Sequence, residues 1–178
     1  MSMDAHTSGI VDDALSALRP LLEPHYRAHR YAILDGTTIY APLDTNPIAD
    51  LRKQTEGTGY ILATNYDPKM GGWVTGHRLG GFKTFDAVLS AATDMLGVDT
   101  GHRWHIAQAG IHRHYRGSFY KLTGMDWDTE LQIPRYVYSP ADDEFRVFTR
   151  MAHLFHADVR KDDGTLVPRF QYLEQYPQ

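Results

Sequence analysis

The chain has 178 residues, of which 42% are hydrophobic and 22% charged, as in an ordinary globular protein with one domain or two small ones. Its net charge of −4 argues against a protein that binds nucleic acid or an anionic membrane through bulk electrostatic attraction. It contains no cysteine, which excludes a disulfide scaffold, a Cys-ligated zinc site and a catalytic thiol.

The first elements along the chain are a helix and a hairpin. Ser8 is a suitable N-cap, and apolar residues at helical spacing predict a helix that ends near His29. Pro20 lies within this segment and either kinks the helix or divides it into two. Residues 31–41 then predict a β-hairpin, because Asp35-Gly36 supplies the two positive-φ residues of a type I′ turn between β-forming segments.

A sheet followed by a second helix is predicted for the rest of the N-terminal half. Thr84 caps a helix over residues 85–96, and Gly97 ends it and opens a linker that reaches Gly101. The strands before this helix are similar to the sheet-plus-helix DNA-binding domains of integrases and plant ethylene-response factors, although the acidic balance of this half argues against that role. The predicted strands are residues 59–65, 73–78 and 81–83.

The C-terminal part has short strands and frequent turns, which are typical of a small β-barrel. The predicted fold class is therefore α+β. Residues 1–100 are expected to form a helix, antiparallel-sheet and helix unit, and residues 101–178 a small β-barrel. The candidate barrel strands are residues 111–116, 118–125, 134–139, 145–150 and 166–172.

Two motifs rich in arginine and aromatic residues bracket this C-terminal part. The first is RHYRG at residues 113–117, with Tyr120 shortly after it, and the second is VPRF at residues 167–170. Between them, in order, lie Glu130, Tyr138, Arg150 and Phe155. In order and spacing, this pattern resembles the domain of unknown function 1653 family of small bacterial and phage proteins.

The resemblance implies a compact, Src-homology-3-like small β-barrel and no established activity. Its middle part departs from the family pattern, which contains a His-Ser-Glu-Thr tetrad. Glu130 keeps the place of the tetrad's Glu, but Asp128 replaces its His and Leu131 its Thr. Any activity that depends on the tetrad is therefore expected to be reduced or lost in this chain.

The arginines and tyrosines of these motifs are candidates for one binding surface. Guanidinium groups and aromatic faces suit phosphate contact and base stacking. In the alternative interpretation, the arginine stems cover apolar strands and their charged ends pair with Asp128, Glu130 or Asp158. The candidate ligand- or partner-binding residues are Arg113, His114, Tyr115, Arg116, Tyr120, Glu130, Tyr138, Arg150 and Arg169.

Histidines are the remaining candidates, since six of the ten lie between residues 102 and 156. Side chains alternate along a strand, so His112 and His114 are expected to share one face. No HExxH-type motif is present, and packed or exposed structural histidines are the favoured interpretation, so no metal site is predicted. No cofactor is predicted either, because the sequence has no Walker loop and no dinucleotide fingerprint.

The sequence therefore predicts a non-enzymatic recognition module that binds a nucleic acid or a protein. The alternative is a small-molecule enzyme in which His114 and Glu130 form an acid–base pair. No signal peptide and no membrane-spanning run is visible, so a cytoplasmic protein without a membrane partner is expected. The sequence leaves the ligand, catalysis and oligomeric state open.

Overall fold

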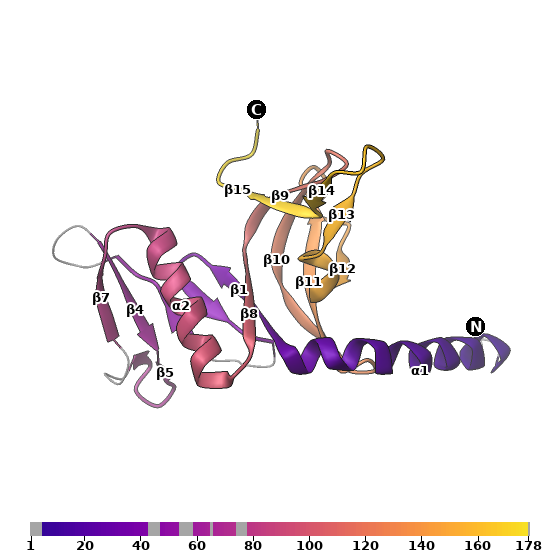
Figure 1. The fold of residues 1–178 in the computed structure, drawn as a ribbon, viewed down its shortest axis with the longest axis horizontal. Helices are drawn as coiled ribbons and strands as arrows, with labels where there is room; N and C mark the ends of the chain where they lie inside the picture. The colour runs from indigo at the N-terminus through magenta and orange to yellow at the C-terminus, as the bar shows by residue number, and fades with distance from the viewer. Residues whose placement is uncertain (1–4, 43–46, 54–58, 65, 74–77, 178) are drawn as a thin grey trace.

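The protein is an α+β molecule with two main sheets, as the sequence predicts. The structure is a computed structural model that describes residues 5–42, 47–53, 59–64, 66–73 and 78–177 (Figure 1). One sheet is formed by the N-terminal part of the chain, and the other by the C-terminal part. No helix in these described ranges is long and apolar enough to cross a membrane.

The N-terminal helix, α1 (Ala5–Ala28), continues through both of its prolines, Pro20 and Pro24. The chain is therefore not divided into two helices at Pro20. Both prolines are exposed, so water can solvate the carbonyl groups that lose a helical hydrogen bond. The helix begins at Ala5, which places Ser8 inside it and not at its cap. Figure 1 shows α1 extending away from the two sheets toward the N-terminus.

The N-terminal sheet is mixed and curled, with strand order β7-β4-β3-β2-β1-β8. Its neighbouring strands are antiparallel except for β1 and the edge strand β8, which run parallel. A separate antiparallel pair is formed by β5 (Tyr66–Asp67) and β6 (Gly72–Trp73). The six strands are β1 (His29–Asp35), β2 (Thr38–Tyr40), β3 (Ala49–Asp50), β4 (Tyr60–Thr64), β7 (Arg78–Phe82) and β8 (Arg103–Gln108).

The predicted strands of this half are found in part. The strand predicted over 59–65 is β4, and the one predicted over 81–83 is the end of β7. The segment 73–78 falls largely on residues 74–77, which lie outside the described residues. The sheet-plus-helix arrangement is thus embedded in a six-stranded sheet, not in a three-stranded one.

The predicted hairpin of β1 and β2 is present, but its turn differs from the prediction. Asp35 is the last residue of β1 and pairs with Thr38, so the loop consists of Gly36 and Thr37. Gly36 has a φ of 59°, whereas Asp35 is not among the described residues with positive φ. Glycine adopts this backbone conformation without steric cost, so it alone supplies the positive φ in the turn.

The helix α2 (Phe85–Thr100) covers the N-terminal sheet and connects β7 to β8 (Figure 1). Thr84 caps it as predicted, since its hydroxyl accepts a hydrogen bond from the Ala87 amide at 3.2 Å. The prediction that Gly97 ends the helix is wrong. The left-handed residue that terminates it is Gly101, with a φ of 66°, so the expected linker is the last turn of α2.

The parallel strand β8 was not predicted, and it joins the two halves of the molecule. On one side of the β1–β8 pair, Ala32, Leu34 and Trp104 pack in a core with α2. On the other side, Tyr31 and Ile33 pack in a second core with the aromatic residues of the C-terminal sheet. Both faces of β1 are therefore buried, as is usual for parallel pairs. The predicted division after residue 100 stays a prediction, although the strand pairing groups β8 with the N-terminal sheet.

The C-terminal sheet is antiparallel, with strand order β12-β11-β10-β9-β15. In the described part of the chain, β12 and β15 are edges that do not pair with each other, so the sheet is open and no closed barrel is formed. A further hairpin and the short helix α3 (Ala152–Phe155) lie against it. Its strands are β9 (Gly110–His114), β10 (Phe119–Asp128), β11 (Ile133–Pro140), β12 (Phe148–Met151) and β15 (Phe170–Leu173), and the hairpin consists of β13 (Asp158–Arg160) and β14 (Leu166–Pro168).

The strand predicted over residues 166–172 is divided at Arg169 between two sheets. β14 pairs with β13, while β15 pairs with β9. The Arg169 amide donates to Ala157 O at 3.1 Å, and its carbonyl accepts from the Tyr115 amide at 3.0 Å. These two hydrogen bonds fix Arg169 beside the end of β9, so the two sequence motifs meet in space.

Candidate functional site

An arginine–aromatic cluster forms where the two motifs meet. His114 is its centre, with ring centroids 4.5 Å from Tyr115, 5.0 Å from Phe170 and 6.1 Å from Tyr120. The Tyr120 and Tyr138 rings are 5.5 Å apart in an edge-to-face contact, which is a favourable geometry for aromatic rings. We call this set, with its three arginines, the arginine–aromatic cluster: His114, Tyr115, Arg116, Tyr120, Tyr138, Arg150 and Arg169.

Three guanidinium groups of the cluster have no carboxylate partner within 4 Å among the described residues. Arg116 lies over the Tyr115 ring, 5.4 Å from its centroid. Arg150 Nε donates a hydrogen bond to Tyr138 Oη at 3.2 Å. Arg169 Nε is buried and has no hydrogen-bond partner in the described part of the chain. The cluster therefore brings three positive charges together, and the Arg169 Nε–H donor has no acceptor among the described residues.

The positive charge of these arginines affects the pKa of His114. Burial is the largest cause that lowers the pKa of His114, and the positive charges of Arg150, Arg169 and Arg116 lower it further. His114 is consequently neutral at neutral pH and does not add to the positive charge. Its ring is therefore a polar but uncharged group between the charged side chains of Arg116, Arg150 and Arg169.

The alternative pairing expected from the sequence does not occur for these arginines. Asp128 pairs with Arg135, whose Nη1 lies 3.1 Å from Asp128 Oδ2, and Asp126 shares the same guanidinium. Asp158 forms no ion pair within 4 Å in the described residues. The carboxylates that were candidates to neutralise the cluster are thus used elsewhere or unpaired.

Two open hollows adjoin the cluster. The first has a volume of about 550 Å³ and a mixed charge, with three basic and two acidic side chains around Tyr115. The second, of about 340 Å³, is lined by Tyr120 and exposed aromatic residues. The hollow of about 550 Å³ is lined by Tyr115, Arg116, Arg160, Lys161, Asp162 and Asp163.

Comparison with known proteins assigns a family to this part of the chain. Residues 110–172 match the family described as protein of unknown function DUF1653. Residues 110–172 form a DUF1653 domain. None of the curated proteins matches the chain. A crystal structure of a DUF1653 protein from Bordetella bronchiseptica is 26% identical, covers 39% of this chain and 91% of its own, and superposes with a TM-score of 0.35.

Two of the predicted site residues of the DUF1653 domain lie outside the cluster. Arg113 is exposed and alternates with His112 and His114, so its side chain is on the opposite face of β9. Glu130 is exposed in the turn after β10, where its amide donates to Asp128 Oδ1 at 3.1 Å. His114 lies at the other end of β10, and a strand of ten residues is roughly 30 Å long. The structure therefore does not bring together His114 and Glu130, the pair that an acid–base enzyme would need.

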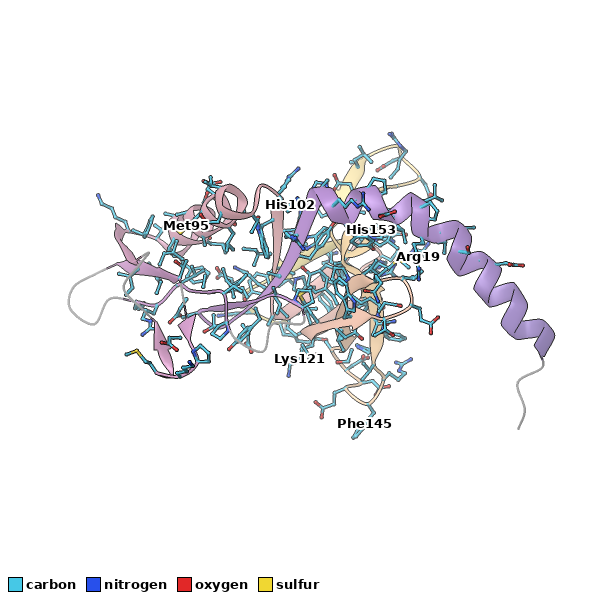
Figure 2. All side chains as sticks on the ribbon, turned by 90° about the horizontal axis from the view of Figure 1, so that it is seen from below. Arg19, Met95, His102, Lys121, Phe145 and His153 are labelled. Atoms are coloured by element: carbon cyan, nitrogen blue, oxygen red, sulfur yellow. The ribbon has the colours of Figure 1, made fainter. Side chains whose placement is uncertain are left out.

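A second cluster of titratable side chains was missed by sequence reasoning. Five imidazoles form a row between the DUF1653 domain, α1 and the β1–β8 pair. Successive ring centroids along this row are 4.9, 4.7, 5.3 and 5.2 Å apart. In Figure 2, His153 lies beside α1. We call the set the histidine row: His153, His25, His29, His105 and His156.

Phenol groups complete the surroundings of the histidine row. Tyr31 stacks on His105 and His156, with centroids 5.4 and 5.9 Å away, and its hydroxyl contacts His25 Nε2. Tyr136 Oη is 2.9 Å from His156 Nε2 and donates to Ala32 O at 2.9 Å. The row thus connects three elements of the N-terminal half to β11 and α3.

Four imidazoles of the histidine row, His25, His105, His153 and His156, have lowered pKa values and are neutral at neutral pH. Burial is the largest cause that lowers the pKa of His105 and of His153 to about 4 and that of His156 to about 3. Neighbouring titratable groups, including other imidazoles of the row, lower these pKa values further. Within the described residues, no three His, Asp or Glu side chains are placed to hold a metal ion. The sequence signal is the spacing of four residues between His25, near the end of α1, and His29, the first residue of β1, but their partners are more than 70 residues away in the chain.

Proposed function

We propose that the DUF1653 domain is a recognition module whose arginine–aromatic cluster binds an anionic group of a partner. The observation that supports this proposal is a set of three arginines that have no carboxylate partner among the described residues, one of which has a buried Nε–H with no acceptor there. A buried donor without a partner destabilises a protein by about 1–3 kcal/mol, and more for a charged group. A phosphate or carboxylate oxygen would relieve this cost on binding.

Single-stranded nucleic acid is the partner that best fits the cluster. It carries phosphates at regular intervals, and the basic residues extend from Arg150 and Arg169 to Arg116, Arg160 and Lys161 in the adjoining hollow. Tyr115 offers an aromatic face beside these charges. Guanidinium contacts to the backbone together with base stacking are the usual means by which single strands are bound. A protein carboxylate is the other partner that this chemistry admits.

The proposal includes two statements carried by the family resemblance and the sequence. The open five-stranded sheet is interpreted as a variant of the Src-homology-3-like barrel that the family resemblance implies. The protein is expected to act in the cytoplasm, and this location stays a prediction. The alternative of an acid–base enzyme is not favoured, because His114 has no carboxylate partner among the described residues.

The test is a fluorescence anisotropy titration with labelled oligo(dT) between about 50 and about 200 mM salt. Binding should weaken steeply with salt, because each phosphate contact releases counterions. Replacement of Arg169 by Gln should weaken binding about tenfold, the value of one charge-assisted hydrogen bond. Arg27→Gln is the matched control, since Arg27 is exposed on α1 and pairs with Glu23.

Two outcomes would contradict the proposal. If oligo(dT) shows no salt-dependent binding at low ionic strength, nucleic acid is excluded as the partner. If Arg169→Gln binds as tightly as the wild type, the cluster is not the contact surface. A peptide with a free C-terminal carboxylate, titrated in parallel, detects the protein partner.

A further inference from the structure

A further pocket, separate from the two hollows beside the arginine–aromatic cluster, lies at the junction between the N-terminal half and the DUF1653 domain. It has a volume of about 300 Å³, which is within the range of small-molecule sites. Its walls come from α1, β1, β8 and the end of β10. We call it the junction pocket. The lining residues that carry the argument are Tyr26, His29, Arg30, Tyr31, Trp104 and Trp127.

The walls of the junction pocket are largely aromatic. Two tyrosines and two tryptophans line it, from four different elements. Tyr31 and Trp104 are 3% and 9% exposed and belong to the two separate cores, so little of either ring reaches the pocket. Tyr26 and Trp127 are half-buried and offer more of their rings. The Trp104 indole is also fixed by hydrogen bonds from its Nε1 to Leu96 O at 3.1 Å and to Thr100 Oγ1 at 3.0 Å. The buried Tyr31 and Trp104 therefore give the pocket a fixed wall, and the rings of Tyr26 and Trp127 are the aromatic surfaces available to a flat apolar ligand.

The charge of the pocket lining indicates the charge of the ligand that would bind there. Arg30 is exposed, lines the pocket, and has no carboxylate within 4 Å among the described residues. Among the described residues, no Asp or Glu side chain lines the junction pocket. Among the described lining residues, a cationic ligand would meet the positive charge of Arg30 and no carboxylate, whereas an acidic group would pair with the Arg30 guanidinium.

Two polar atoms at this site also lack a partner in the described part of the chain. They are Tyr26 Oη and His29 Nδ1, both buried. Burial raises the pKa of the Tyr26 hydroxyl, which consequently keeps its proton and remains a donor. A polar substituent that reaches the inner end of the pocket would therefore be stabilised by a hydrogen bond.

We propose that the junction pocket binds a planar aromatic molecule that carries an acidic group. The ring lies against Tyr26 and Trp127, the half-buried aromatic residues of the lining, and the acidic group contacts Arg30 at the rim. This site is distinct from the proposed anion surface of the DUF1653 domain, because the two share no residue. Binding at the junction would also stabilise the contact between the two halves of the molecule, since both contribute walls.

The test uses two probes of the same shape, naphthoate and its neutral amide, naphthamide. The indole N–H signals of Trp104 and Trp127 in a proton–nitrogen NMR spectrum report directly on the site. We expect both signals to shift saturably with naphthoate, and naphthamide to bind about tenfold more weakly because it lacks the charge.

Variants separate the ring contacts from the charge contact. Arg30→Gln should lower the affinity for naphthoate about tenfold and leave that for naphthamide unchanged. Ala41 also lines the pocket, so Ala41→Phe should fill it and abolish binding of both probes. Arg27→Gln, a nearby exposed charge outside the pocket, should bind like the wild type. Because Arg30 is exposed, its variant tests the proposal even if Ala41→Phe fails to fold.

Three results would overturn the proposal. The first is the absence of indole shifts with either probe. The second is equal affinity of naphthoate for the wild type and for Arg30→Gln. The third is loss of naphthoate binding in Arg169→Gln, because it would place the probe at the arginine–aromatic cluster. Conversely, failure of oligo(dT) binding with intact naphthoate binding would disprove only the function proposed for the cluster.

Discussion

The arginine–aromatic cluster and the histidine row both contain buried or half-buried histidines, but the charges around these histidines differ. In the arginine–aromatic cluster, His114 lies among Arg116, Arg150 and Arg169, which stay positive at any physiological pH. In the histidine row, the neighbours are mainly imidazoles and phenols, and burial keeps His105, His153 and His156 neutral. The cluster therefore keeps positive charges that an anion can neutralise, whereas the neutral imidazoles His105, His153 and His156 contribute packing and hydrogen bonds at neutral pH. We infer that the first region is suited to binding and the second to holding the two halves together.

The largest expected effect concerns Tyr136, which joins the histidine row to the core. Its side chain is fully buried, so Tyr136→Ala should destabilise the protein by about 3–5 kcal/mol. Tyr136→Phe should cost less, about 1–3 kcal/mol, because it keeps the ring but leaves Ala32 O without its hydrogen bond. Urea denaturation measures both. Equal stability of Tyr136→Phe and the wild type would show that the row does not stabilise the junction.

An acid-induced loss of stability is the next largest effect. The pKa values of His105, His153 and His156 are lowered from 6.5 to about 4, 4 and 3 in the folded state. Unfolded chains therefore bind protons more readily below pH 6.5, so the stabilisation is complete above that pH and declines as the pH falls toward the folded pKa values. The melting temperature should decrease through this window, by about 2–4 °C for each kcal/mol lost.

Variants of the histidine row separate this effect from the titration of carboxylates. His105→Gln and His153→Gln should each flatten the dependence of melting temperature on pH between 6.5 and 4. His102→Gln is the control, since His102 lies outside the row. Parallel curves for all three variants and the wild type would disprove the role of the row in acid lability.

A smaller effect tests the arginine–aromatic cluster directly. Arg150→Gln removes one of the positive charges that lower the pKa of His114, so that pKa should rise toward its ordinary value. Arg113→Gln should leave it unchanged, because Arg113 lies on the opposite face of β9. An NMR titration of the His114 ring provides the measurement. No difference between the two variants would mean that the arginines are too well solvated to act on His114.

Sequence patterns predicted the local features of the fold. Thr84 and the apolar spacing after it define the start of α2, because capping depends on residues within one turn. The RHYRG and VPRF motifs identified the DUF1653 domain and most of its cluster. Glu130 was included because of its place in the motif order, which says nothing about distance across a strand of ten residues.

Features that depend on contacts between distant segments could not be predicted in this way. The parallel pairing of β8 with β1 joins residues more than 70 positions apart, and local periodicity contains no such information. Gly97 was taken as a helix end because glycine costs about 1 kcal/mol within a helix, a penalty that packing of α2 on the sheet offsets. The open edges of β12 and β15 are likewise a matter of tertiary arrangement.

The sequence by itself therefore determined the fold class, the DUF1653 domain and the chemistry available at its surface. Only the tertiary structure decided which charged groups remain without partners, because ion pairing depends on distance in space. It also assembled the histidine row and the junction pocket from α1, β1, β8 and the DUF1653 domain. Their residues are scattered along the chain, and burial against β1 and β8 is what brings them together.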